Sequence, residues 1–306
     1  MSTILITGGT GLIGTALSTL LREKGHRVMI LSRGAAPSQP DTFRWDPDTG
    51  YIDPEAIREA DFIIHLAGAG VADKRWSAKR KKVIEESRTK SAALLVQALT
   101  GIPNRVKAVI SASGIGWYGA DAVIPNPRPF QETDPADGAF LGETCRRWEE
   151  AIAPVATLGK RLVIFRTGIA LSTKGGALVE FRKPLRFGAA AILGSGKQVA
   201  SWIHIEDLCR LYLHAIEHDD CSGVFNAVAP RPVDNRTLTL ALARQLKGRY
   251  FVPVYVPSFL LKIMIGEMSI EVLKSTTVSA EKVRSIGFQF IYPSIEKALA
   301  ALLPRN

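Results

Sequence analysis

The sequence has few cysteines and no hydrophobic run long enough to cross a membrane. Its 306 residues include only three cysteines, Cys145, Cys209 and Cys221, without a paired spacing. This pattern excludes a disulfide framework or a cysteine zinc site and indicates reduced thiols. No apolar stretch reaches the roughly 20 residues of a membrane helix, and the chain opens on a candidate strand instead of a charged leader. We therefore expect a cytoplasmic protein with no membrane partner and no metal site.

Acidic residues are in the minority, which raises the question of a nucleic-acid partner. Lysine and arginine number 39 against 29 acidic residues, for a formal charge of +10. Nucleic-acid binders usually gather basic residues with interleaved aromatics. The dense basic cluster here, residues 74–82, heads a helix expected over 77–99, and a solvated helix face accounts for it. We expect no nucleic-acid partner; nucleic-acid binding stays a third hypothesis that depends on charge alone.

What the sequence does contain is a glycine turn close to its first residue. Residues 3–7 are apolar enough for a buried parallel strand, and residues 12–21 have the apolar spacing of a helix. Between them lies a tight turn with the spacing Gly8-x-x-Gly11-x-x-Gly14. A strand, a bare turn and a helix N-terminus form a site for a dinucleotide pyrophosphate, because the backbone can approach the phosphates. The residues predicted to bind the cofactor here are Gly8, Thr10, Gly11, Leu12, Ile13 and Gly14.

These residues, in this place, resemble the short-chain dehydrogenase/reductase superfamily, and specifically its extended, epimerase-like branch. Further matching stretches follow in the family's order: His65–Ala69, Ser111-x-Ser113 before Tyr118-Gly119, Ser201–Leu208 and the C-terminal tail. The resemblance covers the whole chain. It implies an atypical, epimerase-family (sugar nucleotide epimerase-like) protein with a small-molecule substrate.

The end of the second expected strand bears on which cofactor is bound. A free ribose 2′-hydroxyl usually meets an acidic residue there, whereas a 2′-phosphate is met by arginine. Here the strand 26–31 is followed by Ser32 and Arg33. A guanidinium binds a phosphate with strong charge-assisted hydrogen bonds. The sequence therefore favours NADP over NAD, unless Arg33 is only a surface loop residue.

Three further places complete the predicted cofactor site. After the strand at 61–66, small residues let the backbone run beside the adenosine, which adds Leu66, Ala67 and Gly68. Arg88 in the basic helix could reach a phosphate or form an exposed ion pair. Ser111 ends the next strand. His65, inside an apolar strand, is interpreted as a packed residue.

The usual acid–base couple of the family is missing. The resemblance assigns the catalytic serine to Ser113, with Ser111 second, but no Tyr-x-x-x-Lys pair follows in residues 138–149. In catalytic members the tyrosine transfers the proton and the lysine lowers its pKa. The candidates to replace the couple are Tyr118, Glu143 and Arg146. Glu143, Arg146 and Glu149 could equally form the polar face of an amphipathic helix.

The expected fold class is α/β, a doubly wound parallel (Rossmann) sheet of six or seven strands with a smaller C-terminal α+β substrate subdomain. The cofactor domain spans 1–170 and is completed by about 201–229; residues 171–200 and 230–306 form the substrate or lid part. We expect a loop over 35–55, Asp207 as a helix N-cap, a helix over 258–273 and a short strand at 287–290. The apolar stripe 259–265 predicts a core helix or a homodimer contact.

The function indicated is that of an NADP-dependent oxidoreductase or epimerase-like protein. Its substrate would be a small carbonyl, a hydroxyl compound or a sugar nucleotide. Because the Tyr-x-x-x-Lys couple is absent, a catalytically impaired NADP-binding sensor or regulator is the alternative.

Overall fold

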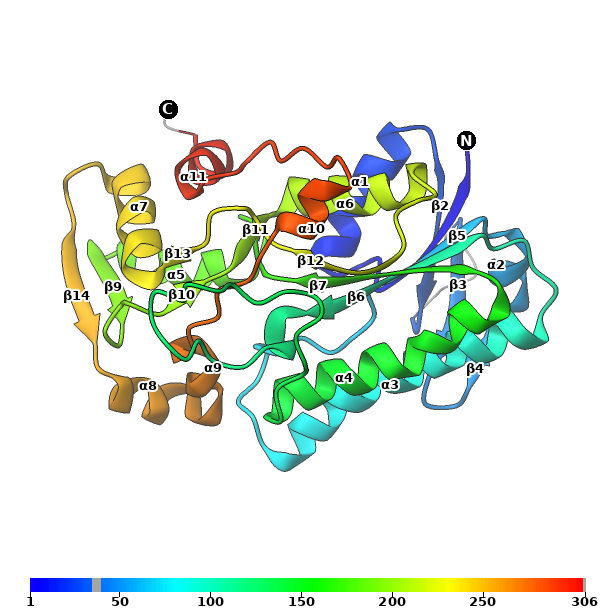
Figure 1. Ribbon diagram of the computed structural model, residues 1–306, viewed down its shortest axis with the longest axis horizontal. Helices are drawn as coiled ribbons and strands as arrows, with labels where there is room; N and C mark the ends of the chain where they lie inside the picture. Colours follow the sequence, from blue (N-terminus) through cyan, green and yellow to red (C-terminus); the bar gives the residue numbers. More distant parts are fainter. Residues whose placement is uncertain (35–39, 305–306) are drawn as a thin grey trace.

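The computed structural model describes residues 1–34 and 40–304, and its centre is one large, mostly parallel sheet (Figure 1). Eight strands lie in the order β12-β7-β6-β5-β1-β2-β3-β4, and each pair is parallel except β3 with β4. The strands are β1 (Thr3–Thr7), β2 (Arg27–Ser32), β3 (Thr42–Asp46), β4 (Tyr51–Ile52), β5 (Phe62–His65), β6 (Ala108–Gly114), β7 (Arg161–Thr167) and β12 (Gly223–Ala227).

Helices cover both faces of this sheet, because its strands are apolar on both sides. On β1, Ile4 and Ile6 face one core cluster while Leu5 faces the other. The first cluster packs beneath α1 (Leu12–Glu23) and α6 (Ile205–Glu217). The second packs against α2 (Pro54–Glu59), α3 (Ala78–Gly101) and α4 (Phe140–Ile152). Figure 1 shows α1 and α6 above the sheet and α3 and α4 below it, which confirms the doubly wound α/β class.

The strand order contains a switch point at the middle of the sheet. β1 has β2 on one side and β5 on the other, so the chain order reverses there. Ligands of such folds bind outside the carboxyl ends of the strands at this switch point. Because β1, β2, β5 and β6 are parallel, the turns that follow them all lie at this carboxyl end of the sheet.

A second lobe, with its own core, lies beyond β12 and β7, at the left of Figure 1. Its helices are α5 (Ala177–Leu185), α7 (Asn235–Lys247), α8 (Ser258–Ile265), α9 (Ser269–Leu273) and α11 (Ile295–Leu302). Its strands pair two by two: β8 (Ile169–Leu171) with β11 (Trp202–His204), β9 (Ala189–Leu193) with β14 (Val252–Val256), and β10 (Val199–Ala200) with β13 (Val233–Asp234). This is the smaller α+β part that the sequence predicts. A short helix, α10 (Glu281–Ser285), returns to pack on β12.

Three local expectations are wrong. The loop expected over 35–55 instead holds β3, β4 and the start of α2, and β3 extends the parallel sheet; residues 35–39 lie outside the described part. The expected helix 258–273 is interrupted at Gly266, whose φ of +64° ends α8 before a short 3-10 turn. Residues 287–290 form no strand; Phe288 is buried in the first core cluster instead.

No helix among the described residues combines the length and the apolar character needed to cross a membrane.

Candidate functional site

The turn between β1 and α1 has a shape that only glycine allows. Gly8 has a φ of +71°, and a Cβ on it would lie 2.9 Å from the carbonyl carbon of Leu66. A Cβ on Gly14 would lie 2.3 Å from the Gly8 carbonyl oxygen. Real Cβ atoms do not approach backbone so closely, so the turn is packed against β5 and against the first turn of its own helix. Around Gly11, by contrast, only the Gly8 carbonyl oxygen lies within 4 Å of where a Cβ would be, at 3.3 Å, so this side of the turn is open.

The N-terminus of α1 is free to receive an anion. Its N-cap is Gly11, which has no side chain to accept from the first-turn amides, and the first turn holds no acidic residue. Unpaired amides and the positive end of the helix dipole attract phosphate. Gly11 itself is fixed by its N–H, which donates to the Gly8 carbonyl at 3.0 Å.

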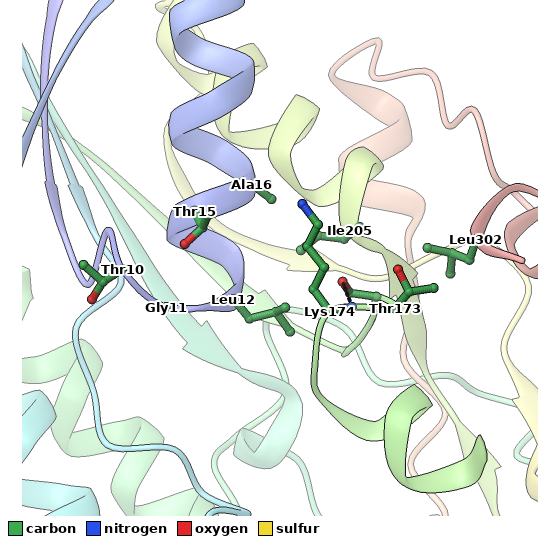
Figure 2. A pocket seen from close by; sticks show the side chains of 10 residues that line it. Thr10, Gly11, Leu12, Thr15, Ala16, Thr173, Lys174, Ile205 and Leu302 are labelled. Carbon is green, nitrogen blue, oxygen red and sulfur yellow. Dashed lines mark hydrogen bonds between the residues drawn. The ribbon is translucent and has the colours of Figure 1, made fainter. Parts of the chain in front are cut away.

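A cavity of about 370 Å³ adjoins this helix end. Figure 2 shows Thr10, Gly11 and Leu12 on one side and the Lys174 side chain extending between α1 and α6. Lys174 was not predicted, because its loop follows β8 and meets α1 only in the folded chain. The sequence feature that could have indicated this contact is the glycine pair Gly175-Gly176. Their missing side chains leave room for Leu12, which lies 3.4 Å from where either Cβ would be.

The segment after β5 is held by a chain of buried polar groups. The Thr7 hydroxyl accepts hydrogen bonds from the amides of Leu66 at 3.1 Å and Ala67 at 3.2 Å. It also lies 2.7 Å from His65 Nδ1. Burial, helped by the charge of Arg88, lowers the pKa of His65 to about 3, so the imidazole is neutral. His65 is thus packed, and it fixes the strand end beside the glycine turn.

Arg88, on α3, also stabilises the segment after β5. Its guanidinium donates to the carbonyls of Ala69 and Ile84 and stacks over the Trp148 ring at 5.0 Å. A Cβ on Gly68 would lie 3.0 Å from the Arg88 Cζ, so Gly68 leaves room for this side chain. Burial lowers the pKa of Arg88. Ser111, fully buried on β6, donates its hydroxyl to the Ala112 carbonyl.

At the end of β2 the structure places a second arginine that the sequence did not reveal. Arg33 is exposed just after the strand. The neighbouring strand β3 pairs in parallel so that Arg44 stands opposite Ser32. Arg44 is also exposed and lies over the Tyr51 ring at 5.7 Å. Arg44 was missed because β3 was read as a loop.

A buried polar network joins the carboxyl ends of β6, β7 and β12. The Ser113 hydroxyl donates to Glu149 Oε1 at 2.7 Å, and Arg166 donates to both oxygens of Glu149 at 2.9 Å. Ser113, Glu149 and Arg166 are at most 8% exposed. Hydrogen bonds to Glu149 raise the pKa of Arg166 against the opposing effect of burial.

Tyr118 belongs to this network. Its hydroxyl donates to Asn226 Oδ1 at 2.7 Å and accepts from Arg166 at 3.1 Å. Burial, only partly offset by Arg166, raises the pKa of Tyr118 to about 12. The Trp117 ring lies over the Arg166 guanidinium at 3.5 Å. Ser113 and Tyr118 are thus brought together, through Arg166 and Glu149.

Glu143 and Arg146 lie apart from this network. They are on the first turns of α4, and their side chains pair with each other at 2.7 Å, with Glu150 as a further partner of Arg146. The hydrogen bond from Arg146, with the charges of Arg146 and Arg147, lowers the pKa of Glu143. Cys145, on the same helix, points inward to the Gly114 carbonyl, and burial raises its pKa to about 11. Among the described residues, no group of acidic, histidine or cysteine side chains is arranged to hold a metal.

The prediction of Asp207 as a helix N-cap is wrong. The N-cap of α6 is His204, whose Nδ1 accepts from the Glu206 amide at 3.1 Å. Asp207 is fully buried one turn later and accepts the amides of Ile291 and Tyr292, each at 2.9 Å. An aspartate near a helix start can cap that helix or accept hydrogen bonds from another segment, and the sequence does not show which segment comes close.

The residues around the glycine turn fit a dinucleotide. Gly8 and Gly14 pack the turn too closely for a Cβ, an uncapped helix N-terminus lies beside it, and the switch point adjoins it. Gly8 to Gly14 would hold the diphosphate, and Leu66 to Gly68 would flank the adenosine half.

Comparison with known proteins agrees with this geometry. Residues 4–140 match the NAD dependent epimerase/dehydratase family, and residues 256–302 match a domain of unknown function, DUF1731. An epimerase family protein of Mycobacterium leprae is 33% identical over 97% of this chain and 94% of its own length.

Two solved structures have the same fold. The human epimerase family protein SDR39U1, crystallised with NADPH, is 30% identical with a TM-score of 0.87, over 98% of this chain and 99% of that one. A nucleoside-diphosphate sugar epimerase of Corynebacterium glutamicum is 31% identical with a TM-score of 0.80, over 99% of this chain and 58% of that one. The chain described here belongs to the epimerase family and has its NAD(P)-binding fold.

Proposed function

We propose that the protein is an NADP-dependent oxidoreductase or epimerase-like enzyme acting on a small carbonyl, hydroxyl or sugar-nucleotide substrate. The observation that carries the proposal is the bare glycine turn at the switch point, facing an uncapped helix N-terminus. The bound nicotinamide would supply or accept a hydride. The crystal structure of the human relative with NADPH supports the phosphorylated cofactor.

The preference for NADP would come from the two arginines at the end of β2. Arg33 follows Ser32, the last residue of β2, and Arg44 stands opposite Ser32 on the parallel strand β3; both arginines are exposed. Two guanidinium groups can share one phosphate through charge-assisted hydrogen bonds, and no carboxylate ends β2 to repel it. Lys174 would add a positive charge near the diphosphate at the N-terminus of α1.

Ser113 would form a hydrogen bond with the substrate oxygen, and its own hydrogen bond to Glu149 bears on which substrate it can bind. Its hydroxyl proton is already directed to Glu149. The outward lone pairs of Ser113 can therefore accept a hydrogen bond, and a substrate hydroxyl is better matched than a carbonyl. Tyr118 and Glu143 remain candidates for proton transfer, of which only Tyr118 lies in the network. Residues 1–170 with 201–229 would bind the cofactor, and residues 171–200 and 230–306 would close over the substrate.

A sensor or regulator is the second candidate, and the same network favours it. The hydroxyls of Ser113 and Tyr118 both donate within the protein, and no Tyr-x-x-x-Lys couple is present. Such a protein would bind NADPH tightly without turning it over. It could act in the cytoplasm as a monomer or a homodimer.

Titration calorimetry with NADPH and NADH tests the cofactor assignment. We expect the wild type to prefer NADPH and Arg33→Ala to lose about tenfold in NADPH affinity, the value of one charge-assisted contact. Arg22→Ala, at the opposite end of α1, is the matched control and should bind as the wild type does. Equal wild-type affinities for the two cofactors would refute the Arg33 assignment.

A turnover screen separates enzyme from sensor. NADPH oxidation, or NADP reduction, is followed with carbonyls, alcohols and sugar nucleotides, with Ser113→Ala in parallel. Turnover that falls in Ser113→Ala supports the enzyme. Tight NADPH binding with no turnover across the whole panel would favour the sensor.

A further inference from the structure

A second cavity, of about 1060 Å³, lies between the second lobe and the loop that follows β5. The loop contributes Arg75, and α8, α9 and the 3-10 turn between them, η3 (Gly266–Met268), form the opposite wall. Its volume is at the upper end of the range for small-molecule sites. The side chains that matter are Phe259, Ile263, Ile270 and Leu273, which are apolar, and Arg75 and Lys262, which are cationic.

The apolar wall is open to solvent. Phe259, Ile263 and Ile270 are 68, 65 and 61% exposed, so residues 259–265 do not form the buried core helix that was one expectation from the sequence. Single exposed apolar residues are ordinary, but several lining one hollow mark a binding surface. The wall therefore provides apolar area for a ligand to cover.

The two cations have no acidic partner. Among the described residues neither Arg75 nor Lys262 forms an ion pair, and Glu267, which also lines the cavity, is paired with Lys81. The missing side chain of Gly266 leaves room for Arg75, because a Cβ on Gly266 would lie 2.5 Å from the Arg75 Nε. The helix break at Gly266 thus seats a guanidinium at the edge of an apolar hollow.

Both walls continue toward the buried polar network. Leu273 precedes Lys274, whose ammonium donates to the Tyr118 carbonyl at 3.2 Å. On the other wall, Arg75 precedes Trp76, whose ring packs edge-on against Phe140, the first residue of α4, at 4.9 Å. The cavity wall is therefore one residue from a contact with Tyr118, a member of the polar network, and one residue from a contact with α4.

We propose that this cavity binds the substrate of the activity proposed above, and that this substrate is an anionic amphiphile. Its apolar body would cover Phe259, Ile263 and Ile270, and its carboxylate or phosphate group would pair with Arg75 and Lys262. The proposal depends on the proposed function only for naming the ligand a substrate; the binding site stands on the cavity itself.

The charge of the lining decides between this ligand and a second copy of the chain. A twofold dimer across this face would bring identical patches together. Arg75 and Lys262 would then be buried against a patch whose one acidic residue, Glu267, is already paired with Lys81, in a protein of charge +10. An anionic ligand supplies the missing negative charge, and its apolar body covers the exposed wall.

The test measures direct binding of dodecyl phosphate, below its aggregation concentration, to the full chain by calorimetry. We expect saturable binding, and binding about tenfold or more weaker in the double variant Arg75→Gln with Lys262→Gln, because charge-assisted bonds are lost. Ile263→Gln should also weaken binding. Met264→Gln makes the same change on the next residue, which does not line the cavity, and should bind as the wild type does. NADPH affinity should be unchanged in every variant.

Four results would overturn the proposal. They are no saturable binding, equal binding of dodecyltrimethylammonium, unchanged affinity in the double variant, or association only with phosphatidylglycerol vesicles and not with dissolved dodecyl phosphate. The two proposals fail separately. Loss of dodecyl phosphate binding with NADPH binding intact rejects the cavity alone, and the reverse rejects the cofactor assignment alone.

Discussion

Gly14 shows how a missing side chain shapes the site. The position is helical, so its φ is ordinary, yet a Cβ would lie 2.3 Å from the Gly8 oxygen and 2.6 Å from the Gly9 Cα. Both atoms are backbone and cannot rotate away. The first turn of α1 is therefore pressed against the glycine turn, and that contact sets the shape of the turn proposed to bind the diphosphate.

Replacing Gly14 by alanine should consequently damage both binding and stability. The turn must move by more than half an ångström, and we expect NADPH binding to be lost and unfolding free energy to fall by about 1–3 kcal/mol, as for overpacking in a core. Calorimetry and urea unfolding measure the two effects. Gly101→Ala, at a helical glycine with open space around it, is the control and should be neutral or slightly stabilising. Normal NADPH affinity in Gly14→Ala would contradict this account.

His65 is a second residue whose environment makes a measurable prediction. Its folded-state pKa is about 3, against an unfolded value near 6.5. Between those values the unfolded chain binds the proton and the folded chain does not. The contribution of the neutral ring is therefore complete above about pH 6.5 and is lost as the pH falls toward 3.

Unfolding free energy measured from pH 7.5 to 5 should fall on the acidic side by up to about 1.4 kcal/mol per pH unit from this one group. His65→Gln keeps a polar side chain near Thr7 but cannot titrate, so its stability should be lower at neutral pH and change less with acidification. His204 and His214, whose pKa values are also lowered by burial, remain in both proteins and cancel in the comparison. Parallel pH curves for the two proteins would show that His65 does not titrate as described.

Among the elements, the N-terminus of α6 acts as a latch for the C-terminal segment. Asp207 accepts two backbone amides from 291–292, and the Tyr292 ring lies 3.8 Å from the ring of His204. The Tyr292 hydroxyl donates to Glu206. One helix start therefore fixes the path of the chain between α10 and α11.

Removing the latch should loosen this segment without unfolding the sheet. Asp207→Ala leaves two amides without acceptors, and we expect a loss of about 1–3 kcal/mol in stability. Hydrogen exchange at residues 290–293 should accelerate more than exchange in β1 or β5. Glu206→Gln, a milder change on an exposed neighbour that keeps an acceptor oxygen for the Tyr292 hydroxyl, serves as the control. Equal protection of residues 290–293 in Asp207→Ala and the wild type would refute the latch.

The same elements show what the sequence could and could not predict. The strand, glycine turn and helix at residues 3–21 follow from local pattern, and the structure has them. β3 was missed because several prolines surround it, whereas its pairing with β2 and the burial of Trp45 decide its conformation. The partners of Asp207 and Ser113 come from segments 84 and 36 residues away, and no local pattern carries that information.

For the molecule as a whole, one buried carboxylate contributes several of the hydrogen bonds that join the loop after β6 to the segment after α9. Asp121, 9% exposed, lies in the loop after β6. Its oxygens accept the hydroxyls of Ser275 at 2.7 Å and Thr277 at 2.8 Å, and the Thr277 amide at 3.0 Å. The segment 275–277 comes one residue after the end of α9, so Asp121 helps to fix the position of the cavity wall relative to the polar network.

Asp121→Ala should therefore affect the second cavity but leave the cofactor site unchanged. Three buried donors lose their acceptor, which costs about 1–3 kcal/mol for each group left unsatisfied, less whatever water recovers. We expect faster hydrogen exchange at 275–278, weaker dodecyl phosphate binding, and unchanged NADPH affinity, because the glycine turn makes no contact with Asp121. Asp121→Asn keeps one acceptor oxygen and should fall between the alanine variant and the wild type. If NADPH affinity falls as much as dodecyl phosphate binding in Asp121→Ala, the two sites are coupled through the sheet, and the joint does not act locally.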